Sequence, residues 1–261
     1  MRLAKSRKLL LAPQIHPKKY FVFFWGPRRG AHNKEPMKDI FLLDIDETLF
    51  DFPREEREAL CRTLKKRGVE PTEEMLARYH AINESYWKKL ERGEVTRARL
   101  VVERFEVFLR EYGRTDSPEE FSRGYFSELA SGGKFYEGAE AFVKALKERG
   151  RIFLVTNGAQ FTQTRRIAAS GLGAYADGAF ISEAIGINKP SKEYAAYVEA
   201  HIEGYERSRA VWVGDSLTSD APCAASLGID FILYRPQGAP EGYKGLCAQS
   251  YDEALELIGK M

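Results

Sequence analysis

The chain has 261 residues, of which 44% are hydrophobic and 12% aromatic, and this length and composition suit one large domain or a core with a smaller appended one. The formal net charge of +2 is unevenly distributed, because residues 1–37 hold nine Lys or Arg and one Glu; subtracting this segment from the total leaves about −6 for residues 38–261. A mildly acidic body argues against a nucleic-acid-binding surface, and no apolar run approaches the roughly 18 residues that a membrane span needs.

The basic segment at residues 1–37 contains only short apolar runs, at 9–11 and 20–25. A signal peptide has a longer apolar centre and a cleavage site of small residues. We therefore expect a disordered extension, or one that is absent if translation starts at Met37, rather than an arm that binds a membrane or nucleic acid.

The cysteines are three in number and widely spaced, at Cys61, Cys223 and Cys247. An odd number without a Cys-x-x-Cys pair favours reduced thiols over a disulfide framework or a zinc site. This pattern leads us to expect a cytoplasmic protein.

The folded body begins with an apolar run at 40–43, which predicts a buried strand, and then changes to a purely helical pattern. Between residues 53 and 130, Pro or acidic residues that suit a helix start are followed repeatedly by apolar residues at helical spacing. The four predicted helices cover about 53–68, 71–90, 96–113 and 117–131.

From residue 137 onward, predicted helices and strands alternate. The helices are expected at about 137–149, 160–170, 191–203, 219–227 and 251–260, and the strands at 152–155, 179–182, 210–213 and 229–234. Alternation of helices with apolar strands predicts a parallel sheet covered on both faces. The predicted fold class is therefore α/β: a doubly wound, Rossmann-like core (38–52 and 131–261) with a helical cap (53–130) inserted after the first strand.

Two carboxylates, Asp44 and Asp46, follow the first strand directly. Like charges this close repel each other, and a half-buried Asp needs a cation or hydrogen bonds to stay ionised. A turn or capping role would not require a like-charged neighbour. The pair therefore predicts a metal ion and chemistry at this strand end.

Further polar groups stand where other predicted strands end or helices start. In a doubly wound sheet, ligands bind at the carboxyl ends of the strands, so these groups are expected to converge with the Asp pair. Each alone also has a simpler interpretation, as a turn, a helix lead-in or a helix cap. The segments are 156–158, 189–190 and 214–220.

Taken in order, these segments resemble the four signature motifs of the haloacid dehalogenase (HAD) superfamily, over residues 38 to about 235. Segments 48–52, 156–158 and 213–220, with the Tyr86-Trp87-Lys88 helix, resemble its branch of noncanonical pyrimidine 5′-nucleotidases, whereas 221–225 and 234–236 depart from that branch. The motif residues are Asp44-x-Asp46-x-Thr48, Thr156, Lys189-Pro190 and Gly214-Asp215-x-x-x-x-Asp220.

The resemblance implies phosphoryl transfer through an aspartyl-phosphate. Asp44 would be the nucleophile, and Asp46 would protonate the leaving group and then take a proton from the attacking water. Mg²⁺ would be held by the side chains of Asp44 and Asp215 and by the backbone carbonyl of Asp46, because it prefers hard oxygen ligands. Ser216 and Asp220 would support these ligands from behind.

The resemblance also implies three groups that bind the phosphoryl oxygens. These are the hydroxyl of Thr156, the backbone N–H of Asn157 and the ammonium of Lys189. Relatives that cleave carbon–halogen bonds lack the second Asp of the pair, so the presence of Asp46 disfavours dehalogenation.

Substrate choice is expected to lie in the cap, because the core sees mainly phosphate. Trp87 and Lys88 are the candidates for an exposed pair that contacts the substrate. Other aromatic residues of the cap recur at helical spacing and are better explained as cap core: Tyr79, Tyr86, Phe105 and Phe108.

The function implied is a Mg²⁺-dependent 5′-nucleotidase acting on pyrimidine nucleoside monophosphates. The alternatives are the same chemistry on a sugar phosphate or phosphoglycolate, and an inactive binding protein that keeps the fold. The expected partner is a small phosphate monoester, without nucleic acid polymers or membranes, and the expected state is a monomer or homodimer.

Overall fold

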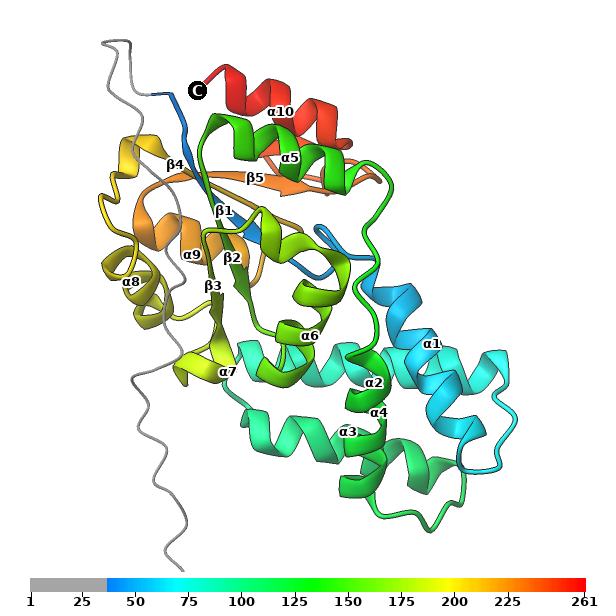
Figure 1. Ribbon diagram of the computed structural model, residues 1–261. Helices are drawn as coiled ribbons and strands as arrows, with labels where there is room; N and C mark the ends of the chain where they lie inside the picture. Colours follow the sequence, from blue (N-terminus) through cyan, green and yellow to red (C-terminus); the bar gives the residue numbers. More distant parts are fainter. Residues whose placement is uncertain (1–36) are drawn as a thin grey trace, which may run out of the picture.

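The computed structural model describes residues 37–261, so the basic segment discussed above lies outside the described residues except for Met37. Within this range six parallel strands form one sheet in the order β3-β2-β1-β4-β5-β6 (Figure 1), which confirms the predicted fold class. The strands are β1 (Ile40–Asp44), β2 (Arg151–Thr156), β3 (Gly178–Ile181), β4 (Ala210–Gly214), β5 (Asp230–Tyr234) and β6 (Leu246–Ala248).

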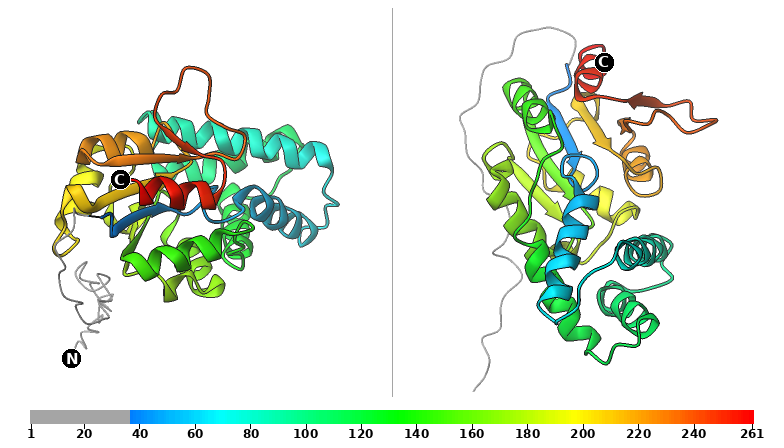
Figure 2. Two further views of the ribbon diagram at one scale, coloured as in Figure 1. Left: turned by 90° about the horizontal axis from the view of Figure 1, so that it is seen from above. Right: turned by 90° about the vertical axis from the view of Figure 1, so that its right-hand side faces the viewer.

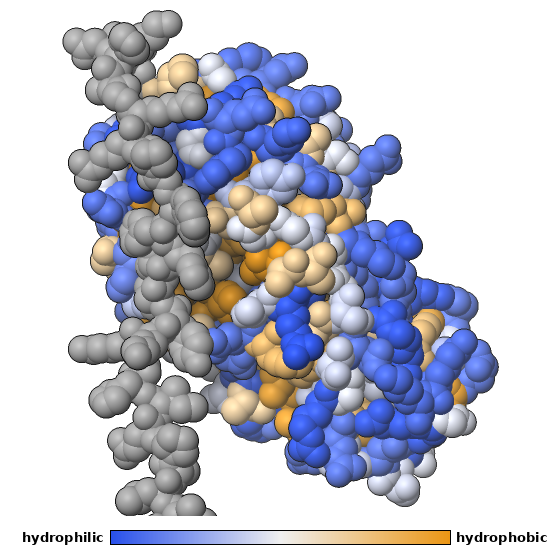
Figure 3. Space-filling model, in the orientation of Figure 1, coloured by the Kyte–Doolittle hydropathy of each residue, from blue (hydrophilic) through white to orange (hydrophobic). Residues whose placement is uncertain are grey.

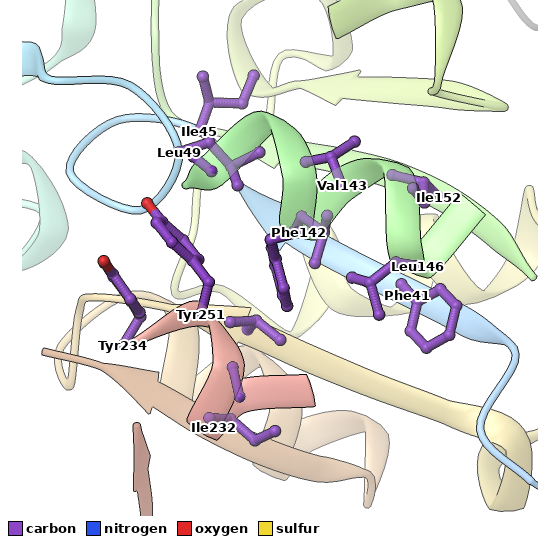
Figure 4. Packing of buried hydrophobic residues seen from close by; sticks show 14 of the residues in the cluster. Phe41, Ile45, Leu49, Phe142, Val143, Leu146, Ile152, Ile232, Tyr234 and Tyr251 are labelled. Atoms are coloured by element: carbon purple, nitrogen blue, oxygen red, sulfur yellow. The ribbon is translucent and has the colours of Figure 1, made fainter. Parts of the chain in front are cut away.

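Helices cover both faces of the sheet, which explains why the central strands are apolar without interruption. Side chains of a strand point alternately to the two faces. On one face, Phe41 and Leu43 pack with Phe142 and Leu146 of α5 (Ala139–Arg149) and with α10 (Tyr251–Gly259) (Figure 4). On the opposite face, Leu42 belongs to a cluster with α8 (Lys192–Ala200) and α9 (Asp220–Leu227).

The helices between β1 and α5 lie beyond the carboxyl ends of the strands (Figure 2). They have a hydrophobic cluster of their own. The side chains of Thr72, Thr96 and Ser117 accept hydrogen bonds from backbone N–H groups at three of the helix starts, as N-caps do. The division into core and cap at residues 52 and 131 stays a prediction. The helices are α1 (Phe52–Lys65), α2 (Glu73–Glu91), α3 (Arg97–Glu111) and α4 (Pro118–Leu129).

The structure differs from the sequence-based expectation at a few short elements. Ser182, expected to end a strand, instead begins the one-turn helix α7 (Ser182–Ile185), and β6 was not predicted. Both elements are too short for a periodic pattern. A helix α6 (Gln160–Ser170) follows β2 as predicted, and two 3₁₀ turns lie at η1 (Leu172–Ala174) and η2 (Arg207–Arg209).

The surface is mostly polar. Hydrophilic side chains dominate the face drawn in Figure 3, and among the described residues Met37, Phe161 and Leu246 are the large hydrophobic side chains that are exposed. All three cysteines are free, as expected. No helix within residues 37–261 is both long and apolar enough to cross a membrane.

Candidate active site

The predicted site residues meet at one edge of the sheet. Strands β1, β2 and β4 end beside one another at Asp44, Thr156 and Gly214, and a cavity of about 280 Å³ opens between these ends and helices α1–α4. Small-molecule sites usually measure about 300–1,000 Å³, so the cavity suits a small ligand. The ten residues predicted for the site all line it: Asp44, Asp46, Trp87, Lys88, Thr156, Asn157, Lys189, Asp215, Ser216 and Asp220.

Lys189 holds the centre of the site through its ammonium group. Its Nζ lies 2.6 Å from Asp44 Oδ1 and 2.7 Å from Asp220 Oδ1, with the side chain 2% exposed. Burial alone would lower the pKa of Lys189, but the carboxylates of Asp220 and Asp44 keep it well above its ordinary value. Lys189 therefore carries a permanent positive charge at the strand ends.

Asp220 anchors this lysine and is held by further hydrogen bonds on both of its carboxylate oxygens. Its Oδ1 also accepts a hydrogen bond from Trp212 Nε1 (3.0 Å), and its Oδ2 accepts one from the Ser216 backbone N–H (3.3 Å). A Cβ atom at Gly214 would lie 2.5 Å from the Asp220 carboxyl carbon, so glycine is required where β4 ends. Ser216 and Asp220 thus support the loop that carries Asp215.

Asp44 and Asp215 face each other across the hydroxyl of Thr48. The Thr48 Oγ1 lies 3.2 Å from Asp44 Oδ2 and 3.4 Å from Asp215 Oδ1. Burial raises the pKa of Asp44 to about 7, against the opposing attraction of Lys189. Burial and then the charge of Asp44 raise the pKa of Asp215 well above its ordinary value.

This electrostatic arrangement fits a divalent cation. Carboxylate oxygens of Asp44, Asp215 and Asp220 lie within 4.8 Å of one another. Lys189 compensates Asp44 and Asp220, whereas the hydrogen bond to the Asp215 carboxylate comes from the neutral hydroxyl of Thr48. A hard cation between Asp44 and Asp215 would supply the missing charge, and oxygen donors are the ligands that Mg²⁺ prefers.

Asp46 points away from Asp44 toward helix α6. Arg166 Nη1 lies 2.6 Å from Asp46 Oδ1, and Gln163 Nε2 donates to Asp46 Oδ2 at 2.5 Å. Neither Gln163 nor Arg166 was expected at the site from the sequence. Their spacing of three residues places them on one face of the helix that follows Thr156, and this spacing was the sequence signal that could have indicated them.

The segment after β2 is fixed by side-chain contacts to the backbone. Thr156 Oγ1 accepts hydrogen bonds from the Gly158 N–H (2.9 Å) and from Gln163 Nε2 (3.0 Å). The Asn157 side chain both donates to Lys189 O and accepts from Lys189 N, each at 2.9 Å. Thr156, Asn157 and Lys189 are therefore held as one unit.

Helices α2–α4 contribute the opposite wall of the cavity. Trp87 is half-buried beneath the Arg97 guanidinium, 5.6 Å from the ring centre, and Lys88 pairs with Glu84 at 2.6 Å on the exposed side. Of the cap aromatics expected in the core, Tyr79, Phe105 and Phe108 are fully buried.

A buried polar network in this wall was missed from the sequence. Glu56 accepts hydrogen bonds from Asn83 Nδ2 and pairs with His80 Nδ1, each at 2.6 Å, and Asn83 Oδ1 accepts one from Arg104 Nη1. Arg104 is 1% exposed, and its Nε and Nη2 have no hydrogen-bond partner among the described residues. The available sequence signal was Arg104, a charged residue at the helical spacing of the apolar residues Leu100 and Phe108.

Comparison with known proteins agrees with this geometry. A family model described as haloacid dehalogenase-like hydrolase matches residues 38–228. The chain belongs to this family of hydrolases. The resemblance inferred from the four motifs is thereby confirmed at the level of the superfamily.

Three relatives of this hydrolase cover most of its length. HAD-hydrolase YfnB of Bacillus subtilis is 33% identical over 199 residues (76% of this chain, 85% of YfnB). The pyrimidine 5′-nucleotidase PynA of Streptococcus pneumoniae is 33% identical over 223 residues (84% and 94%), and the pyrimidine 5′-nucleotidase YjjG of Escherichia coli is 30% identical over 182 residues (70% and 79%). A crystal structure of YfnB bound to magnesium matches with a TM-score of 0.80 and 29% identity, covering 85% of this chain and 99% of that one.

Proposed function

We propose that this hydrolase is a Mg²⁺-dependent phosphatase that cleaves the 5′-phosphate of pyrimidine nucleoside monophosphates. The observation that carries the proposal is the Asp44 carboxylate, held 2.6 Å from Lys189 at the base of a cavity that also contains Asp46. The relatives PynA and YjjG are named pyrimidine 5′-nucleotidases, which supports the nucleotide as the substrate class.

The chemistry takes place in two displacements at phosphorus. In the first, an Asp44 carboxylate oxygen forms a bond to phosphorus while the bond to the nucleoside 5′-oxygen breaks; that oxygen takes the electron pair and a proton from Asp46, leaving as an alcohol. In the second, water attacks the phosphorus, gives a proton to Asp46 and releases phosphate from Asp44. Two easier steps thus replace one difficult hydrolysis.

The phosphoryl group requires donors and positive charge around it. The Thr156 hydroxyl, the Asn157 backbone N–H and the Lys189 ammonium would bind its oxygens, because preorganised donors stabilise charge that is redistributed in the transition state. Since Asn157 fixes the Lys189 backbone, these donors keep their mutual geometry.

The metal would be held by the side chains of Asp44 and Asp215 and the backbone carbonyl of Asp46, with Ser216 and Asp220 behind them. When bound, Mg²⁺ would offset the charge of the phosphate dianion and the carboxylates and so permit their approach. The protein itself already contributes the charge of Lys189 on the other side of Asp44.

The nucleoside would occupy the part of the cavity between the strand ends and the cap. Phe52, Trp87 and Phe126 give this region aromatic walls, and Arg104 lines it with a guanidinium that is incompletely hydrogen-bonded. The charge of Arg104 is balanced through Asn83 by Glu56, so its ligand is expected to be a neutral acceptor. A carbonyl oxygen of a pyrimidine base has this character.

The test is a comparison of kcat/KM for UMP, dUMP, dTMP, purine nucleotides, phosphoglycolate and sugar phosphates, with Mg²⁺ and with EDTA. We expect pyrimidine nucleotides to be preferred and EDTA to abolish turnover. The Asp44→Asn variant should lose turnover and should no longer retain phosphate covalently. A preference for sugar phosphates or phosphoglycolate would show that the proposed substrate class is wrong. Full activity of Asp44→Asn would refute the mechanism.

A further inference from the structure

The carboxylate of Asp46 is held on both oxygens by helix α6. Gln163 donates to one oxygen at 2.5 Å and Arg166 to the other at 2.6 Å. A group that transfers a proton must lie within hydrogen-bonding reach of the leaving oxygen, and a misplacement of about 1 Å can cost roughly 100-fold in rate. What fixes Arg166 therefore affects the chemistry.

Arg166 is itself buried, and each of its three guanidinium nitrogens donates a hydrogen bond. Its side chain is 1% exposed, and its guanidinium lies over the rings of Phe50 (5.1 Å) and Phe52 (5.6 Å). While Nη1 contacts Asp46, Nε and Nη2 both donate to Glu55 Oε2, the first at 2.8 Å. Arg166 thus joins Asp46 to Glu55.

Glu55 connects this pair to both segments through which the chain enters and leaves helices α1–α4. It lies in the first turn of α1, and its other oxygen, Oε1, accepts hydrogen bonds from the backbone N–H groups of Gly133 and Lys134 on the returning segment. The two segments run side by side, since the Asp51 N–H donates to Lys134 O at 2.9 Å (Figure 1).

Glu55 is buried, and the backbone fits closely around its carboxylate. Glu55 is 2% exposed, and a Cβ at Gly132 would lie 2.7 Å from its Oε1. Burying Glu55 and Arg166 beside the partly exposed Asp46 costs desolvation energy, which apolar packing would avoid. A requirement of the site explains the arrangement better than stability does.

We propose that Glu55 and Arg166 are positioning residues for Asp46, so that proton transfer to the leaving group depends on the geometry of the two segments that connect core and cap. This inference rests on the proposed function, because it takes Asp46 as the group that protonates the nucleoside oxygen.

Glu55→Gln is the decisive variant, assayed with two substrates. The amide can still accept the Gly133 and Lys134 N–H groups, but it presents N–H to Arg166 where a carboxylate oxygen stood. A nucleoside leaves as an alkoxide unless it is protonated, whereas p-nitrophenolate is a stable anion that needs no proton. Asp46 takes a proton from water in the second displacement with either substrate, so the comparison uses kcat/KM, which reports the steps up to departure of the leaving group. We expect kcat/KM for dUMP to fall about 10–100-fold, since general acid catalysis contributes about 10²–10⁴-fold, and kcat/KM for p-nitrophenyl phosphate to change less than about 3-fold.

Glu58→Gln is the matched control. Glu58 lies one turn further along α1 and pairs with Lys134 Nζ at 2.7 Å, so it also joins α1 to the returning segment. Its other partners, Arg54 and Arg62, are on the exposed side of α1. Glu58→Gln should therefore leave the ratio of the two kcat/KM values unchanged. Asp46→Asn gives the ratio expected when the proton donor is lost.

The outcomes separate the inference from the proposed function. If the wild type hydrolyses neither substrate with Mg²⁺, the proposed function fails and the inference with it. If the wild type hydrolyses both and Glu55→Gln lowers kcat/KM equally for both, or for neither, only the positioning role is overturned. If Glu55→Gln does not fold by circular dichroism, Arg166→Lys must show the same substrate-dependent loss, and equal losses on both substrates would overturn the inference.

Discussion

The ammonium of Lys189 lies 2.6 Å from the carboxylate of Asp44, with side chains only 2% and 8% exposed. The lysine comes from the loop before α8 and the aspartate from the end of β1, so the tertiary fold alone creates this pair. Because Asp220 shares the same ammonium at 2.7 Å, the removal of Lys189 would leave two buried carboxylates without a cation.

Lys189→Met is therefore expected to lose both activity and stability. Breaking a buried ion pair by removing one partner costs about 3–5 kcal/mol, so the free energy of unfolding in urea with EDTA should fall by roughly this amount. Lys192→Met, a substitution at an exposed position of α8, serves as the control and should unfold like the wild type. An unchanged midpoint for Lys189→Met would show that the pair is not needed for stability.

Asp215→Asn is expected to separate metal binding from folding. Burial and the neighbouring Asp44 raise the pKa of Asp215, so its ionised form destabilises the folded, metal-free protein as the pH rises above about 4. At neutral pH in EDTA the variant should have a higher Tm than the wild type. Mg²⁺ at about 100 times its Kd should stabilise the wild type by about 2.7 kcal/mol and the variant much less.

Calorimetric scans with and without Mg²⁺ measure both effects on the same samples. An equal rise in Tm on adding Mg²⁺ to the wild type and to Asp215→Asn would contradict Asp215 as a ligand. A lower Tm of the variant in EDTA would contradict the electrostatic explanation, whatever the metal does.

Arg104→Met is expected to reduce recognition of the base while sparing the phosphate chemistry. Hydrogen bonds to charged groups contribute about 1.5–3 kcal/mol, so the ratio of kcat/KM for dUMP over 2-deoxyribose 5-phosphate should fall about 10–100-fold. The abasic compound keeps the sugar and phosphate, so its own kcat/KM should change little. Tyr79→Phe, which keeps the ring stacked on Phe105 in the same cluster and removes only its hydroxyl, is the control. A proportional loss on both substrates would exclude a contact between Arg104 and the base.

His80 is expected to titrate above its ordinary pKa of about 6.5, because Glu56 accepts its hydrogen bond at 2.6 Å. A raised pKa means that protonated His80 stabilises the fold fully below pH 6.5, and that this contribution is lost as the pH rises through the folded-state pKa. With half of the side chain exposed, solvent keeps the contribution small. NMR titration of the His80 ring checks the direction, Glu56→Gln should reduce the shift, and a pKa at or below 6.5 would contradict the interaction.

The elements that sequence predicted well are those with a local cause. Apolar runs such as 40–43 and 210–213 are buried on both faces of the sheet, and the helix starts at Thr96 and Ser117 carry their capping groups within three residues. By contrast, β6 has only three residues, with Leu246 partly exposed, so its pairing with β5 depends on the assembled sheet.

The site, too, has residues that the sequence predicted and residues that it did not. Asp44, Asp46 and Asp215 stand at strand ends, where chain order alone predicts convergence. The partners that orient them could not be predicted, because Arg166 is 120 residues from Asp46 and 111 from Glu55. Only the fold shows that a polar face of α6 is buried against both.

The separate hydrophobic cluster of helices α1–α4 has an evolutionary consequence. Its residues pack chiefly with one another and not with the clusters on either side of the sheet. Random substitutions on the cavity-facing side of these helices can therefore change which molecule is accepted without moving the strand ends. Proteins with this architecture can therefore diverge in substrate specificity while the residues at the strand ends stay the same.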